Sequence, residues 1–165
     1  MVSTPEVRAA QPDDAPAFAA CHLACWREAY GELWGQERFA EMDVDKMARR
    51  RRQEIADGTA THALAEADGE VVAVAISGPS RDDDNPAPQE LYASYVRKAY
   101  QGSGVADALL EATIGQRPAA LWVYRDNPRA TAFYVNHGFI PDGSERTDSE
   151  GILEIRMVRN GDHHG

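Results

Sequence analysis

The most constraining feature of this sequence lies within residues 90–115, where a strand-forming segment passes through a glycine loop into a helix-forming segment. The first part is rich in Tyr and Val, which favours a β-strand. Residues 101–106 then read Gln-Gly-Ser-Gly-Val-Ala, and the apolar residues Val105, Ala108, Leu109 and Ala112 recur at helical spacing. The order therefore predicts a strand, a loop and a helix, with the loop leading directly into the helix N-terminus.

A glycine loop at a helix N-terminus is suited to binding a phosphate group. The first backbone N–H groups of a helix have no partner within it, and the helix dipole places positive charge beside them. Gly102 and Gly104 have no Cβ to keep a ligand at a distance or to disfavour positive φ. The loop has neither the Lys-Ser/Thr pair of a P-loop nor the third glycine of a dinucleotide-binding fold, so it indicates neither class.

Two segments resemble the signature motifs of the GCN5-related N-acetyltransferase (GNAT) family. Residues 101–106 resemble its Gln/Arg-x-x-Gly-x-Gly/Ala motif, with Ala106 where many members have glycine. Residues 127–139, which read NPRATAFYVNHGF, resemble its N-x-x-A-x-x-F-Y-x-x-x-G-F motif. The two motifs occur in the family's order with a predicted strand between them, and the resemblance extends over residues 5–159.

The resemblance implies both a fold and an activity. The fold class is α/β (α+β): a mixed, mostly antiparallel central sheet of six to seven strands with about four flanking helices, splayed between the central strand and the next. The activity is that of an N-acetyltransferase, an acyltransferase that uses acetyl-CoA as co-substrate and moves the acetyl group directly to a primary amine of a small molecule or a peptide. The alternative is a non-catalytic acyl-CoA-binding sensor or scaffold with the same fold.

The resemblance also implies roles for particular residues. Tyr134 would act as the general acid beside the departing sulfur, and Glu90 is a candidate base acting through water. Asn127 would hydrogen-bond the pantetheine arm of the cofactor, and it is also a plausible helix cap; the two roles are compatible. The other expected cofactor-binding residues, which would hold the arm or the pyrophosphate largely by their main chain, are Tyr95, Val96, Gln101, Gly102, Ser103, Gly104, Val105 and Ala106.

Composition limits the partners of this chain. It has 165 residues, of which 43% are hydrophobic and 27% are charged, and we expect a single domain over residues 1–165 with its core at about 5–159. The net charge of −10 argues against nucleic acid as a partner. No apolar run approaches the ~20 residues that span a bilayer, and no secretory signal is seen, so we expect a cytoplasmic protein without membrane contact. The sequence leaves the oligomeric state open; a homodimer is the commonest arrangement of soluble oligomers.

Cys21 and Cys25, the only cysteines, lie one helical turn apart in the first predicted helix. Their Cβ atoms would be about 5–6 Å apart, which exceeds the roughly 3.5–4.5 Å of a disulfide. We therefore expect both thiols to stay reduced. The sequence offers too few suitably spaced ligands for a metal site, and none is predicted.

The first two predicted helices and the loop of residues 78–88 are expected to lie near the site of the amine acceptor. The first helix is predicted to run to about Tyr30, where Gly31 and Gly35 interrupt it, and a second helix is predicted from Val44 to Ala56. Trp26, Tyr30 and Trp34 are either core residues or one wall of the acceptor pocket, which family members build in this region. Residues 78–88 are polar and rich in Gly and Pro, and they predict a mobile loop whose aspartates are either solvated or attractive to an amine.

The remaining elements follow from turn and cap signals. Residues 61–67 and 70–77 flank Asp68-Gly69, which predicts a two-residue hairpin. Residues 119–124 predict a buried strand, and a helix is expected from the Asn127 cap to Gly138. Residues 139–144 and 152–158 predict the last two strands.

Overall fold

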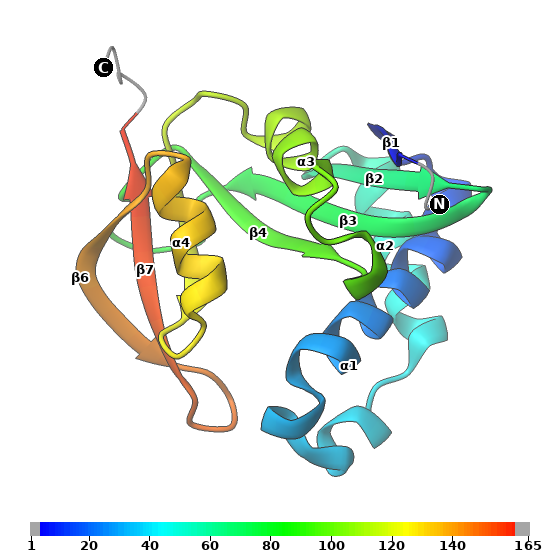
Figure 1. Cartoon of the computed structure of the whole chain (residues 1–165), viewed down its shortest axis with the longest axis horizontal. Coiled ribbons are helices and arrows are strands. Elements are labelled where there is room, and N and C mark those ends of the chain that lie inside the picture. The colour runs from blue at the N-terminus through cyan, green and yellow to red at the C-terminus, as the bar shows by residue number, and fades with distance from the viewer. Residues whose placement is uncertain (1–3, 161–165) are drawn as a thin grey trace. The chain divides into compact units, whose positions relative to one another are not determined.

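The computed structural model describes residues 4–160 and shows a sheet flanked by helices (Figure 1). Within these residues seven strands form one sheet in the order β1-β2-β3-β4-β5-β7-β6, and β4 and β5 run parallel. This mixed sheet with four α-helices confirms the predicted fold class. The strands are β1 Glu6–Ala9, β2 Thr61–Ala67, β3 Glu70–Pro79, β4 Gln89–Val96, β5 Ala119–Tyr124, β6 Ile140–Thr147 and β7 Leu153–Arg159, and the helices are α1 Ala15–Ala40, α2 Val44–Asp57, α3 Val105–Thr113 and α4 Pro128–Asn136.

The chain forms two compact units, and the boundaries between them fall within strands β3 and β4 and after helix α3. The first consists of the residues up to Ser77 together with Ala93–Thr113, and the second of Gly78–Tyr92 together with the residues from Ile114 onwards. The parallel ladder between β4 and β5 contains the register pairs Gln89↔Ala119 to Leu91↔Leu121 and reaches no further along β4. Each unit is described by itself below.

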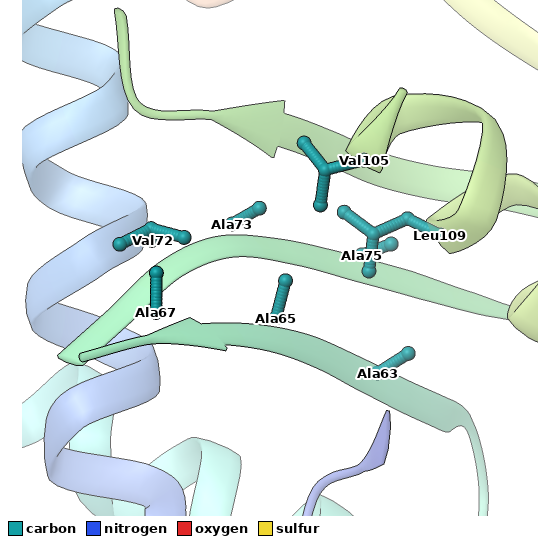
Figure 2. Close-up of a cluster of buried hydrophobic side chains, with 8 residues drawn as sticks. All are labelled: Ala63, Ala65, Ala67, Val72, Ala73, Ala75, Val105 and Leu109. Atoms are coloured by element: carbon teal, nitrogen blue, oxygen red, sulfur yellow. The ribbon is translucent and has the colours of Figure 1, made fainter. Parts of the chain in front are cut away.

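In the first unit helices cover both faces of the strands. Helix α3 packs Val105 and Leu109 onto alanines of β2 and β3, as Figure 2 shows. On the opposite face the ring of Phe18 in α1 contacts that of His62 in β2, with 5.6 Å between centroids. Because alternate residues of a strand point to opposite faces, Ala63 and Ala65 face α3 whereas His62 faces α1. The small alanines allow α3, and therefore the loop before it, to lie close to the sheet.

Helix α1 continues beyond the predicted end at Tyr30. Gly31 lies within the helix, and the break comes at Gly35, which has φ 74° and ψ 161°. A glycine inside a helix costs only about 1 kcal/mol relative to alanine. Ring contacts that join Tyr30 and Trp34 across this turn favour helix there, so packing overrides the local preference of Gly31.

Local signals predicted other boundaries correctly. The hairpin between β2 and β3 turns at Asp68 and Gly69, whose φ values of 53° and 79° are both positive, as a two-residue turn requires. Helix α2 begins after Asp43, whose carboxylate accepts hydrogen bonds from the N–H groups of Asp45 and Lys46 at 3.0 and 3.1 Å. These features need few distant contacts, which is why they are readable from sequence.

In the second unit Arg156 of β7 holds the loop that connects β3 with β4. Arg156 is 6% exposed, and its guanidinium contacts both carboxylate oxygens of Asp84 at 2.7 Å and one oxygen of Asp142 at 2.7 Å. Asp82 accepts a hydrogen bond from Nε1 of Trp122 at 3.0 Å and lies 3.4 Å from Arg156. The loop expected to be mobile is thus tied to the sheet, because two of its three consecutive aspartates are bonded to β5 and β7.

Among residues 4–160, none of the helices combines the length and the apolar character that crossing a membrane requires.

Candidate functional site

The residues predicted to form the site divide between the two units. Tyr95, Val96 and the loop of residues 101–106 belong to the first unit, whereas Glu90, Asn127 and Tyr134 belong to the second. Within the first unit, the side-chain amide of Gln101 donates a 3.4 Å hydrogen bond to the carbonyl of Val96, which joins the loop to the end of β4.

The loop before α3 presents backbone N–H groups to solvent. Gly102 and Gly104 have φ values of 82° and 87°, in the left-handed region that favours glycine. Residues 101–104 are exposed, and the N–H groups of Gly102, Gly104, Val105 and Ala106 have no hydrogen-bond partner within residues 4–160. Such a set of N–H groups at the start of a helix can hold an anion such as a phosphate.

Contacts within the first unit fix this loop. The hydroxyl of Ser103 donates a 2.6 Å hydrogen bond to the carbonyl of Tyr100, and the N–H of Ser103 reaches the same oxygen at 3.3 Å. On the other side of the turn, the carboxylate of Glu28 in α1 accepts hydrogen bonds from the N–H of Lys98 at 3.0 Å and from Nε of Arg97 at 2.9 Å. These bonds hold the loop in one conformation before any ligand arrives, which reduces the entropy lost on binding.

Glu28 was not predicted from the sequence, and these contacts hold the pKa of its carboxyl below the ordinary value. Burial would raise the pKa of Glu28, but the N–H of Lys98 and the guanidinium of Arg97 outweigh it, and the net pKa is lowered. No local motif marks Glu28, because its partners follow it by about seventy positions. Only the packing of α1 beside the end of β4 makes it an anchor of the loop.

In the second unit Asn127 caps helix α4. Its side-chain oxygen accepts a 3.2 Å hydrogen bond from the N–H of Ala130, and its carbonyl accepts bonds from the N–H and hydroxyl of Thr131, each at 3.1 Å. Pro128 occupies the first helical position, where a missing N–H has no consequence. The predicted cap is therefore present, and the hydrogen bond from Ala130 to the side-chain oxygen of Asn127 holds that side chain in place.

Tyr134 lies in the last turn of α4. Its ring is half-buried and contacts the rings of Phe133 and Phe139, with centroid separations of 5.3 and 5.8 Å. Phe139 is 0% exposed and follows the glycine that ends α4. The two phenylalanines of the second motif thus orient the tyrosine ring, which is a packing reason for the motif's Phe-Tyr and Gly-Phe pairs.

Glu90 is buried and paired, whereas a glutamate at a strand end is usually exposed. Its side chain is 2% exposed, and its two oxygens accept hydrogen bonds from the backbone N–H and the guanidinium of Arg81 at 2.9 and 2.6 Å. The guanidinium of Arg81 also lies over the ring of Tyr92, 3.8 Å from its centroid. Glu90 therefore anchors the β3–β4 loop, a role the sequence did not reveal.

Aromatic side chains gather where α1 lies beside β4 in the first unit. Four of them, half-buried, form what we call the aromatic cluster: Trp26, Tyr30, Trp34 and Tyr95. Tyr30 stacks on Trp34 with 4.7 Å between centroids, and the hydroxyls of Tyr30 and Tyr95 are 3.4 Å apart. The three predicted α1 aromatics thus share one cluster with a residue of the strand expected to contact the cofactor.

The sequence matches a family model described as an acetyltransferase (GNAT) domain over residues 27–160. It is also 27% identical over 154 residues to a probable N-acetyltransferase of Mycobacterium tuberculosis, a similarity that covers 83% of this chain and 80% of the relative. The range matched by the family model includes both motifs and all of the predicted site residues, and of the α1 aromatics it includes Tyr30 and Trp34.

Two solved structures illustrate the similarity of fold. The PaiA N-acetyltransferase of Thermoplasma acidophilum, in complex with coenzyme A, aligns with a TM-score of 0.77 and 17% identity over 96% of this chain and 99% of that chain. YncA of Salmonella typhimurium, described with its cofactor acetyl-CoA, aligns with a TM-score of 0.70 and 18% identity over 99% of this chain and 97% of that chain. At such identities the likeness concerns the fold.

Proposed function

This chain belongs to the GNAT acetyltransferase family, and from that premise we propose that it moves an acetyl group from acetyl-CoA directly to a primary amine of a small molecule or a peptide. Enzymes of this family are acyltransferases with acetyl-CoA as co-substrate. The observation that carries the proposal is the preformed loop of residues 101–106, whose unpartnered N–H groups suit the pyrophosphate of that molecule.

The loop and β4 would bind acetyl-CoA mainly through main-chain groups. The pyrophosphate would lie on the N–H groups of Gly102, Gly104, Val105 and Ala106, and the pantetheine arm would run beside Tyr95 and Val96 with a further contact to Asn127. The bound molecule supplies an activated thioester carbonyl. A backbone N–H near Val96 would then stabilise the negative charge that develops on the carbonyl oxygen during attack.

Tyr134 would assist the departure of sulfur as the C–N bond forms and the C–S bond breaks. Reference pKa values of about 10 for tyrosine and about 8.5 for a thiol make full proton transfer to the thiolate uphill by about 2 kcal/mol. Tyr134 therefore stabilises the departing sulfur by donating a hydrogen bond in the transition state rather than by early protonation.

Glu90 remains the proposed base, acting through water. An alkyl amine with a pKa near 10.4 is only about 0.04% neutral at pH 7, so the reaction needs a route for the proton. The ion pair with Arg81 competes with this role, because it occupies both carboxylate oxygens. Glu90→Gln separates the two: loss of a base lowers kcat about tenfold or more and changes its pH profile, whereas loss of an anchor alone lowers the unfolding temperature and leaves the shape of the profile unchanged.

Release of free CoA thiol in the presence of a panel of amines tests the transferase proposal. Tyr134→Phe is expected to lower turnover by at least about tenfold, the scale of a lost transition-state hydrogen bond. Phe133→Tyr is the matched control, because it adds a hydroxyl to the neighbouring ring and leaves that of Tyr134 in place. Full activity of Tyr134→Phe would exclude the leaving-group role, and tight binding of acetyl-CoA without turnover of any amine would favour the sensor or scaffold. The cytoplasmic location stays a prediction from the sequence, which leaves the oligomeric state open.

A further inference from the structure

His22 in α1 is a buried polar side chain without a hydrogen-bond partner among residues 4–160. It is 3% exposed, and neither of its ring nitrogens has a hydrogen-bond partner in the described part of the chain. Buried polar groups are nearly always hydrogen-bonded, since an unpaired one loses its interactions with water without replacement. A site that keeps such a group points to a ligand that completes its hydrogen bonds.

The side chain of His22 lies against the aromatic cluster. Its ring centroid is 4.0 Å from that of Trp26 and 5.2 Å from that of Tyr95. Trp26 in turn lies 6.3 Å from Tyr95, with the two rings nearly perpendicular at 82°. The ring of His22 therefore lies directly against the half-buried rings of Trp26 and Tyr95.

Nearby rings of the same helix already bind cations. The guanidinium of Arg38 lies 3.8 Å from the ring centroid of Trp34, and that of Arg27 lies 5.0 Å from the ring centroid of Phe39. Aromatic faces attract cations through the negative charge of their π-systems. Trp26 and Tyr95, beside His22, and Tyr30, whose ring centroid is 6.1 Å from that of Tyr95, are aromatic rings of the same kind.

The charge state of His22 suits a cationic partner. Burial, with a smaller contribution from Arg51 of α2, lowers the pKa of His22 to about 3, so the imidazole is neutral near pH 7. A neutral imidazole has one nitrogen that accepts a hydrogen bond, and an ammonium group has only donors. The net charge of −10 on the chain also favours cationic ligands.

We propose that His22, Trp26, Tyr30 and Tyr95 form an acceptor subsite that binds an alkylammonium group, and that the substrate is therefore a diamine or a longer polyamine. The reacting nitrogen must be neutral to attack the thioester, whereas cation–π contacts require a charge, so the bound ammonium is a second nitrogen of the same molecule. Tyr95 connects this subsite to β4, the strand that we propose contacts the cofactor, because its side chain belongs to the aromatic cluster and its main chain to β4. The inference rests on the proposed transferase function.

Calorimetric titration of the CoA-saturated protein with three matched amines tests the subsite. The probes are cadaverine, pentylamine and aminopentanol, which share a five-carbon chain and differ at its far end. Cadaverine is expected to bind at least about fivefold more tightly than either control, which is within the range measured for cation–π contacts. Equal affinities for cadaverine and aminopentanol would overturn the proposal.

Variants of the proposed subsite test whether its residues cause the preference for cadaverine. Tyr30→Leu is expected to reduce the preference for cadaverine at least about threefold, and Tyr30→Phe to retain most of it, since phenylalanine keeps the aromatic face. His22→Phe keeps a ring but removes the hydrogen-bond acceptor, and it should also weaken cadaverine binding. The matched control is Tyr92→Leu, which removes a different ring that faces an arginine, and which should leave the preference unchanged. Thermal unfolding of each variant with CoA verifies its fold.

The outcomes distinguish this inference from the proposed function. If amines are acetylated but Tyr30→Leu and His22→Phe bind cadaverine as the parent chain does, the transferase proposal stands and the subsite is wrong. If no amine is acetylated but cadaverine binds preferentially and depends on both residues, the subsite stands and the transferase proposal is wrong.

Discussion

At the scale of single residues, two glycines determine the conformation of the anion-binding loop. The φ values of Gly102 and Gly104 are both positive, and a Cβ at either position would meet no atom within 4 Å. Room for a side chain is therefore present, and the restriction at these positions is conformational. The sequence motif records a requirement of the backbone, because L-residues with a Cβ disfavour this region by roughly 1–2 kcal/mol.

Gly104→Ala is expected to weaken CoA binding. The alanine would either strain the loop or turn the N–H groups of Gly104 and Val105 away from the pyrophosphate, and we expect the Kd for CoA to rise at least about fivefold, equivalent to about 1 kcal/mol. The measurement is calorimetric titration with CoA. Gly151→Ala is a matched control, since Gly151 has φ 82° and equally open surroundings in the turn before β7. If both variants bound CoA as tightly as the parent chain, the loop would not be the binding site.

His22 gives a second prediction at this scale, on stability in acid. Burial lowers the pKa of His22 from 6.5 to about 3, so between these values the unfolded chain binds a proton that the folded chain does not. The free energy of unfolding therefore falls as the pH falls below 6.5, with about 1.4 kcal/mol per pH unit due to this residue.

Urea unfolding of the parent chain and of His22→Phe at several pH values from about 6 to about 4 measures this contribution. The difference in unfolding free energy between the two proteins should change with a slope of about 1.4 kcal/mol per pH unit, because the titration of other groups cancels in the comparison. Parallel curves would mean that His22 becomes protonated in the folded chain.

At the scale of elements, the β3–β4 loop and strand β7 are joined by one arginine. Arg156 donates hydrogen bonds from more than one of its nitrogens. Its Nε bonds to Asp142, and its Nη2 bonds to Asp84 and Ser144. Because of the hydrogen bonds from Arg156, the pKa of Asp84 lies below its ordinary value. The stability that these contacts contribute is complete above the ordinary pKa of Asp84, and it is lost as the pH falls through the lowered pKa of the folded chain.

Arg156→Lys is expected to release the loop while keeping the charge. A lysine cannot reproduce the forked, bidentate contact with Asp84. The carboxylates of Asp82 and Asp142 would also lose some of the hydrogen bonds that the guanidinium now donates to them. We expect a lower unfolding temperature and faster limited proteolysis within residues 78–88. Arg146→Lys is the control, because Arg146 is 43% exposed and contacts Glu154 on the sheet rather than the loop. Proteolysis of Arg156→Lys at the parental rate would show that the loop is held by other contacts.

At the scale of the whole molecule, the net charge bears on the choice of acceptor, whereas the order of the segments along the chain determines which compact unit each motif belongs to. The net charge of −10 belongs to the entire chain and favours cationic acceptors without locating them. Chain order places the two motifs in different compact units, with residues 101–106 in the first and α4 in the second. Strands β3 and β4 each contribute residues to both units.

The sequence by itself determined the features that depend on neighbouring residues. The glycine loop before α3, the Asp68-Gly69 turn and the Asn127 cap all follow from preferences of the backbone within a few positions. The two motifs add the family, and with it the fold class, because they preserve residue types in a fixed order. These predictions were correct because local chemistry leaves few alternatives at such positions.

Only the tertiary structure decided which distant residues meet. It extended α1 past Gly31, paired Glu90 with Arg81, and placed Glu28 against the start of the loop. It also buried His22 beside Tyr95, although more than seventy positions separate them in the chain. Such contacts depend on how helices pack on a sheet, and no pattern of neighbouring residues records this, because burial and pairing are properties of the folded chain.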